Sequence, residues 1–128
     1  MKKTLILMLC AVFCLSFTSC TKVNIPSGAD GTAYFIYGEE NITSEINADD
    51  TELIAKIFNG KTLYSDNPSC GFSKDVSVTM GSKTFCFACD NCKIVYVQEE
   101  DKYFSLSEEE NETLKQILAS YGMYFPCV

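Results

Sequence analysis

The sequence contains no histidine and no arginine among its 128 residues. The lack of histidine removes the imidazole that Ser-His and Cys-His dyads use, and with it a common nitrogen ligand for metals. The lack of arginine removes the bidentate clamp for phosphate groups. Gly28 and Gly31 do not have the GxGxxG spacing of a phosphate-binding loop. These absences disfavour the common classes of enzyme, and we expect no bound cofactor.

Positive charge is scarce as well, and the formal net charge is −7. Nucleic-acid binding depends on a basic surface that releases counterions, so we expect no nucleic-acid partner. The length of the chain fits one domain with a modest core.

Only the N-terminus carries a long apolar run, in "MKKTLILMLCAVFCLSFTSC". Lys2 and Lys3 give it a positive start, and residues 5–17 are largely apolar. This run is shorter than the roughly 20 residues of helix that cross a bilayer. The pattern predicts a secretory signal peptide over residues 1–19 rather than a helix of the domain core.

The end of this run, "SFTSC", resembles the imperfect lipobox of a bacterial lipoprotein precursor. Thr18, Ser19 and Cys20 match the pattern, and Phe17 stands where an aliphatic residue is usual. The resemblance implies acylation of Cys20 and a lipid anchor on the extracytoplasmic side of an envelope membrane. The alternative is cleavage after Thr18 and secretion. Either outcome exports the domain to an oxidising compartment.

The remaining chain is predicted to form a tether over residues 20–32 and a single disulfide-braced α+β domain over residues 33–128. Apolar periodicity indicates two helices, at about 50–58 and 108–121, packed on one face of a sheet. Asp49 with Glu52, and Ser107 with Glu110, have the spacing of helix capping boxes. The sheet is predicted to contain an antiparallel four-stranded meander at about 74–106, with one or two N-terminal strands near 33–37 and 42–46.

Two-residue turns at Gly81-Ser82 and Asp90-Asn91 would set the register of this meander. Because side chains alternate between the faces of a sheet, that register predicts a shared core face. Its members would be Val76, Val78, Met80, Phe85, Phe87, Ile94 and Tyr96. Cys86, Val95 and Val97 would then point to the opposite face.

The same geometry brings four cysteines to one end of the sheet, namely Cys70, Cys89, Cys92 and Cys127. In an exported domain such cysteines usually form disulfides. We expect Cys70 to pair with one of Cys89 and Cys92, and Cys127 to pair with the other. The alternatives are an all-thiolate zinc site, or a redox-active Cys89-Cys92 pair. Cys86 is predicted to be a free thiol.

These features favour a non-enzymatic interaction module of the cell envelope that binds a protein partner. The candidate partner surface comprises Tyr64 and Phe72, from the loop before the meander, with Val95 and Val97 on the sheet face away from the helices. The alternative function is thiol-redox or soft-metal (zinc) binding by the cysteines at positions 70, 89, 92 and 127.

Overall fold

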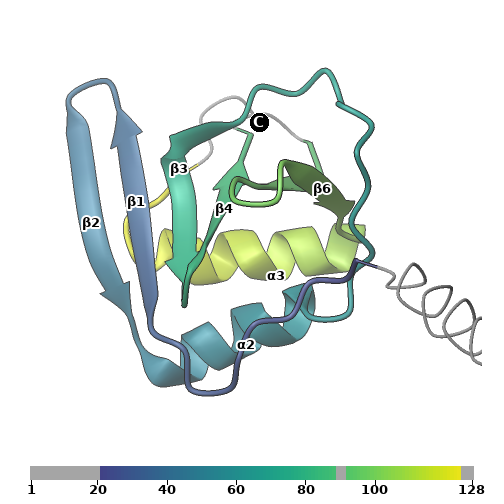
Figure 1. Ribbon diagram of the computed structural model, residues 1–128. Helices are drawn as coiled ribbons and strands as arrows, with labels where there is room; N and C mark the ends of the chain where they lie inside the picture. Colours follow the sequence, from purple (N-terminus) through teal and green to yellow (C-terminus); the bar gives the residue numbers. More distant parts are fainter. Residues whose placement is uncertain (1–20, 89–91, 125–128) are drawn as a thin grey trace, which may run out of the picture.

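The computed structural model describes residues 21–88 and 92–124. It confirms an α+β domain in which two helices pack beneath one antiparallel sheet, as Figure 1 shows. The six strands lie in the order β2-β1-β3-β4-β5-β6. The elements are β1 (Gly31–Tyr37), β2 (Glu40–Ile46), α2 (Ala48–Phe58), β3 (Ser73–Met80), β4 (Lys83–Phe87), β5 (Ile94–Val97), β6 (Lys102–Ser105) and α3 (Glu108–Ala119).

Strands β3 to β6 form the predicted meander, and the β1–β2 hairpin extends it through pairing of β1 with β3. The predicted turn at Gly81-Ser82 is confirmed, because Met80 pairs with Lys83. Gly81 has a φ of 60°, a conformation that glycine adopts without steric cost. Further along the same pair, the register shifts between Ser73 and Ser77.

The predicted register between β4 and β5 is wrong by one residue. Phe87 pairs with Val95 and Phe85 pairs with Val97, so Val95 and Val97 face the core with exposed fractions of 0% and 1%. A shift of one residue exchanges the two faces of a strand. Tyr96 therefore lies on the other face, where its hydroxyl donates to Asp101 Oδ1 at 2.8 Å. A tyrosine hydroxyl without such a partner would be costly to bury in the core.

One hydrophobic core joins the two helices to the sheet. Phe58 of α2 lies at its centre, with ring centroids 5.0 Å from both Phe85 and Phe104. Leu114 and Leu118 bring α3 to the same core, as their spacing of four residues predicts.

The helix starts follow two different capping patterns. The predicted capping box at Ser107 and Glu110 is present at the start of α3. The predicted box at Asp49 is wrong, because α2 begins earlier, with Asn47 as its N-cap. The Asn47 side chain accepts from the Asp50 backbone amide at 2.8 Å, which satisfies a donor that the first helical turn leaves open.

The segment predicted to be a flexible tether is part of the domain from residue 21 onward. The Val23 amide donates to Lys61 O at 3.0 Å, and the Leu63 amide donates to Thr21 O at 3.0 Å. Val23 and Ile25 are both buried, with exposed fractions of 4%. The burial of these two side chains and the hydrogen bonds to residues 61 and 63 offset the entropy cost of ordering a segment whose local sequence suggests flexibility.

Candidate functional site

The sheet face away from the helices carries a ladder of neighbouring side chains. Register partners in adjacent strands place Tyr34, Ser77, Cys86, Tyr96 and Tyr103 side by side in one row. The loop residue Tyr64 extends this row, since its backbone exchanges two hydrogen bonds of 2.9 Å with Tyr103. The row therefore crosses the sheet from β1 to the loop beyond β6.

Four aromatic residues in contact form what we call the aromatic cluster, namely Tyr64, Phe72, Tyr96 and Tyr103. Their ring centroids lie between 5.0 and 6.2 Å apart. Two of the predicted surface residues, Tyr64 and Phe72, therefore lie together on this face. The prediction that Val95 and Val97 join them is wrong, because both valines are buried in the core.

A disulfide between Cys70 and Cys92 fastens the loop that carries Phe72 to the start of β5. This bond agrees with one of the two pairings that the sequence left open for Cys70. Cys89 and Cys127 lie outside the described residues, so a second disulfide between them stays a prediction.

Cys86 has no disulfide partner and is buried under this face, with an exposed fraction of 2%. Burial raises the pKa of its thiol to about 11, and the nearby Glu99 carboxylate adds to the shift. A thiol in this setting is protonated at neutral pH and is a poor nucleophile, because the thiolate is the reactive form. Its surroundings are those of a packed side chain.

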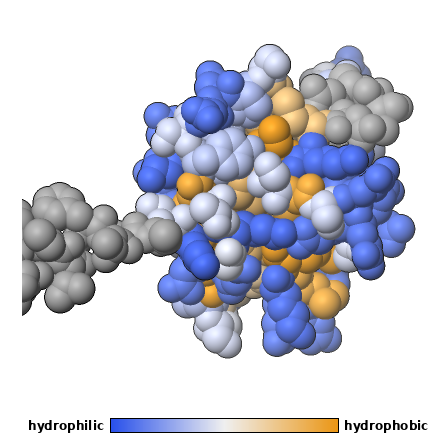
Figure 2. Space-filling view, turned by 90° about the vertical axis from the view of Figure 1, so that its right-hand side faces the viewer, coloured by the Kyte–Doolittle hydropathy of each residue, from blue (hydrophilic) through white to orange (hydrophobic). Residues whose placement is uncertain are grey.

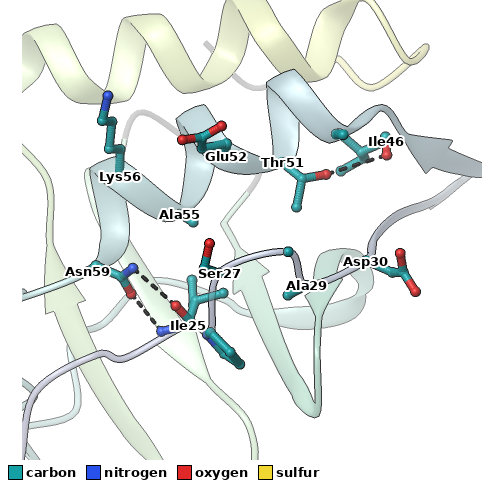
Figure 3. Close-up of a pocket in the computed structure, with 13 residues that line it drawn as sticks. Ile25, Ser27, Ala29, Asp30, Ile46, Thr51, Glu52, Ala55, Lys56 and Asn59 are labelled. Carbon is teal, nitrogen blue, oxygen red and sulfur yellow. Dashed lines mark hydrogen bonds between the residues drawn. The ribbon is translucent and has the colours of Figure 1, made fainter.

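A cavity lies elsewhere in the described part of the chain, between the N-terminal segment and α2 (Figure 3). We call it the α2 groove, and its volume is about 560 Å³. Thirteen residues line it: Ile25, Pro26, Ser27, Gly28, Ala29, Asp30, Ile46, Ala48, Thr51, Glu52, Ala55, Lys56 and Asn59. Segment 25–30 forms one wall, and one face of α2 forms the other.

The side chain of Asn59, just after α2, holds the two walls together at one end. Its Oδ1 accepts from the Ile25 amide at 2.6 Å, and its Nδ2 donates to Ile25 O at 3.2 Å (Figure 3). The amide group thus bonds both backbone groups of one residue, as a neighbouring strand would.

At the other end of the groove, β1 approaches α2 closely at Gly31. A Cβ atom at this position would lie 2.7 Å from Thr51 Oγ1, so only glycine fits without displacement. Thr51 is itself fixed, because its hydroxyl donates to Asn47 O at 2.8 Å. These contacts set the spacing between the strand and the helix.

The lining of the α2 groove combines an apolar floor with a polar rim. Ile25 and Ile46 are buried and contribute to the floor, and the small side chains of Ala48 and Ala55 leave space above it. Ser27, Asp30, Glu52 and Lys56 provide hydroxyl, carboxylate and ammonium groups around it. This arrangement suits a ligand with one apolar group and both hydrogen-bond donors and acceptors.

Two further observations bear on the kind of site. Among residues 21–88 and 92–124, no three side chains of the histidine, cysteine, aspartate and glutamate types cluster as metal ligands would. Within the same residues, no helix has both the length and the apolar character needed to span a bilayer.

Comparison with known proteins gives no matching family model, no matching curated protein and no matching solved structure. The case for a function therefore depends on the residues and geometry of this chain.

Proposed function

We propose that this chain is a lipoprotein of the bacterial envelope, anchored through Cys20, and that it acts as a non-enzymatic binding module. The α2 groove is the main evidence for the binding role. Its volume of about 560 Å³ lies in the range of roughly 300–1,000 Å³ that small-ligand sites occupy. Its apolar floor and polar rim are typical of such sites.

The start of the domain supports a position at the membrane surface. The chain is hydrogen-bonded to the domain from Thr21 onward, so a lipid on Cys20 would leave no spacer between domain and membrane. Lys102 Nζ donates to Thr21 Oγ1 at 3.4 Å, and the backbone of Lys22 pairs with that of Thr62 in an isolated antiparallel bridge. These ammonium groups would face anionic lipid headgroups, an attraction of about 1 kcal/mol for each lysine near the surface. Figure 2 shows this side, with hydrophilic residues over most of it and apolar residues between them.

The chemistry of the groove favours a short peptide segment or a similar amphipathic ligand. An apolar side chain of the ligand would contact Ile25 and Ile46, and its polar groups would meet Ser27, Glu52 and Lys56. Because segment 25–30 begins a few residues after Cys20, the ligand would bind close to the membrane anchor.

The thiol-redox or zinc alternative receives less support from the described cysteines. The sulfurs of Cys70 and Cys92 are bonded to each other, and neither serves as a thiolate ligand while that bond is intact. The remaining described thiol, Cys86, is buried and has a raised pKa.

Blocking the groove tests the binding role. Ser27 is exposed and points into the gap between the walls, so Ser27→Trp fills the groove without disturbing the core (Figure 3). The matched control is Leu53→Trp, because Leu53 is on α2, the helix that forms the other wall, is 47% exposed and does not line the groove. Both variants and the wild-type protein are crosslinked in their own envelope and purified.

We expect the control to retain the ligands or partners of the wild-type protein, and Ser27→Trp to lose at least one of them. If a folded Ser27→Trp variant retains them all, the groove is not the binding site. If the wild-type protein captures nothing specific, the binding role itself is contradicted.

A further inference from the structure

The two outer edges of the sheet differ in how they are covered. The β6 edge is bridged by Tyr64, which exchanges two backbone hydrogen bonds of 2.9 Å with Tyr103. At the opposite end of the strand order, β2 pairs with β1, and no other strand in the described part of the chain pairs with it (Figure 1). One side of β2 therefore presents unpaired backbone groups.

The hairpin register identifies these groups. Gly38, with a φ of 60°, begins a two-residue turn, so Tyr37 and Glu40 form the closing hydrogen-bonded pair. Hydrogen-bonded and non-hydrogen-bonded pairs alternate along an antiparallel ladder. The amide and carbonyl groups of Asn41, Thr43 and Glu45 therefore point outward, away from β1.

This edge lacks several of the features that usually prevent strand pairing, although it carries acidic side chains. Strand β2 is seven residues long, contains no proline or lysine, and pairs with β1 without a bulge. Beside it on the outer face, Tyr34 is 37% exposed and Ile36 is 45% exposed, opposite Thr43 and Asn41 respectively. Apolar side chains next to an open edge would add contact area for an added strand.

The segment that forms this edge carries only negative charge. Residues 23–55, which include β1, β2 and most of α2, contain no lysine or arginine. The same stretch contains seven acidic residues: Asp30, Glu39, Glu40, Glu45, Asp49, Asp50 and Glu52. Two copies of the chain would repel each other here, whereas a lysine- or arginine-rich segment would be attracted.

We propose that the β2 edge binds a basic, extended segment of a protein partner, which adds to the sheet as a further strand. Backbone hydrogen bonds to residues 41, 43 and 45 supply general affinity, and the Glu45 carboxylate, on the same face as Thr43, selects for basic side chains on that face. In Figure 1, β2 lies at the opposite side of the domain from the purple start of the described chain, where the membrane anchor would attach. The edge therefore faces away from the membrane, and this surface is separate from the α2 groove.

Substitutions at Thr43 distinguish strand addition from simple charge attraction. Thr43→Pro removes the outward amide and adds a ring at the edge, and it leaves the pairing with β1 intact because that amide does not point toward β1. Thr43→Ala is the matched control that keeps the amide. The probe is a peptide that alternates lysine with valine, and its counterpart has glutamate in place of lysine. Binding to the full processed protein in detergent is measured by fluorescence anisotropy.

We expect the lysine peptide to bind the wild-type protein and Thr43→Ala, and to bind Thr43→Pro at least about tenfold more weakly. Binding should weaken with added salt, and hydrogen exchange at the Thr43 amide should slow in the complex. A lysine peptide whose alternate amides are methylated should bind weakly, a result that does not depend on whether Thr43→Pro folds.

Three results would overturn the proposal. The first is that the glutamate peptide binds as well as the lysine peptide. The second is that the methylated peptide binds as well as the unmethylated one. The third is a wild-type dimer in sedimentation that Thr43→Pro dissociates, because the occupant would then be a second copy of this chain.

Discussion

Loss of the Cys70–Cys92 disulfide should destabilise the domain by an amount that its loop length determines. The two cysteines are 22 residues apart in the sequence, and closing a loop of that length restricts the unfolded chain. In the chain-entropy description the restriction corresponds to about 3 kcal/mol of stability. For a domain of this size, that loss lowers the melting temperature by about 10–15 °C. Cys70→Ser, Cys92→Ser and the double variant should all show it, because each lacks the same bond.

Urea unfolding followed by circular dichroism measures this effect. The double variant should be no less stable than either single variant, since the second substitution removes nothing further. Near-ultraviolet signals from tyrosine should weaken too, because the bond fastens the loop that brings Phe72 against Tyr96 and Tyr103. Cys86→Ala is the control that leaves the disulfide intact. Unchanged urea midpoints in the single and double variants would refute the view that this bond braces the fold.

Three further substitutions test the register, the buried thiol and the wall of the groove. Val97→Lys places a charge in the core and should cost about 4 kcal/mol or more, whereas Ile94→Lys on the other face should cost far less; thermal melts compare the two. The pKa of Cys86 is raised from 9.0 to about 11, so the unfolded chain loses this proton at a lower pH than the folded chain does. The stability that the neutral thiol contributes is therefore full below about pH 9 and lost by about pH 11. Urea titrations across that range should show the loss in the wild-type protein and not in Cys86→Ala. Asn59→Ala removes both hydrogen bonds to Ile25, which should cost about 1–3 kcal/mol and speed hydrogen exchange at the Ile25 amide.

Local sequence patterns were sufficient where the structure depends on neighbouring residues. The stripe that contains Leu114 and Leu118 predicts α3, and Ser107 with Glu110 predicts its first turn. The turn at Gly81-Ser82 follows from the conformational freedom of glycine.

The sequence was insufficient where distant contacts decide between local alternatives. The turn residues after β4 suggested one register, but burial of Val95 and Val97 and the polar partner of Tyr96 favour the register one residue away. Of the four residues predicted to share one surface, Tyr64 and Phe72 therefore lie together and Val95 and Val97 do not. The α2 groove was missed altogether, because Asn59 and Ile25 are 34 residues apart and nothing near either residue signals their contact.

The intact mass of the protein purified from its native envelope is the most direct test of the central claim, that an exported domain is held at a membrane through Cys20. We predict a chain of residues 20–128 that carries lipid on Cys20 and lacks four hydrogens, two for the Cys70–Cys92 bond and two for the predicted Cys89–Cys127 bond. We also predict that Cys20→Ser prevents the lipid from attaching. A mass that still includes residues 1–19, or a mature chain without lipid, would contradict the account.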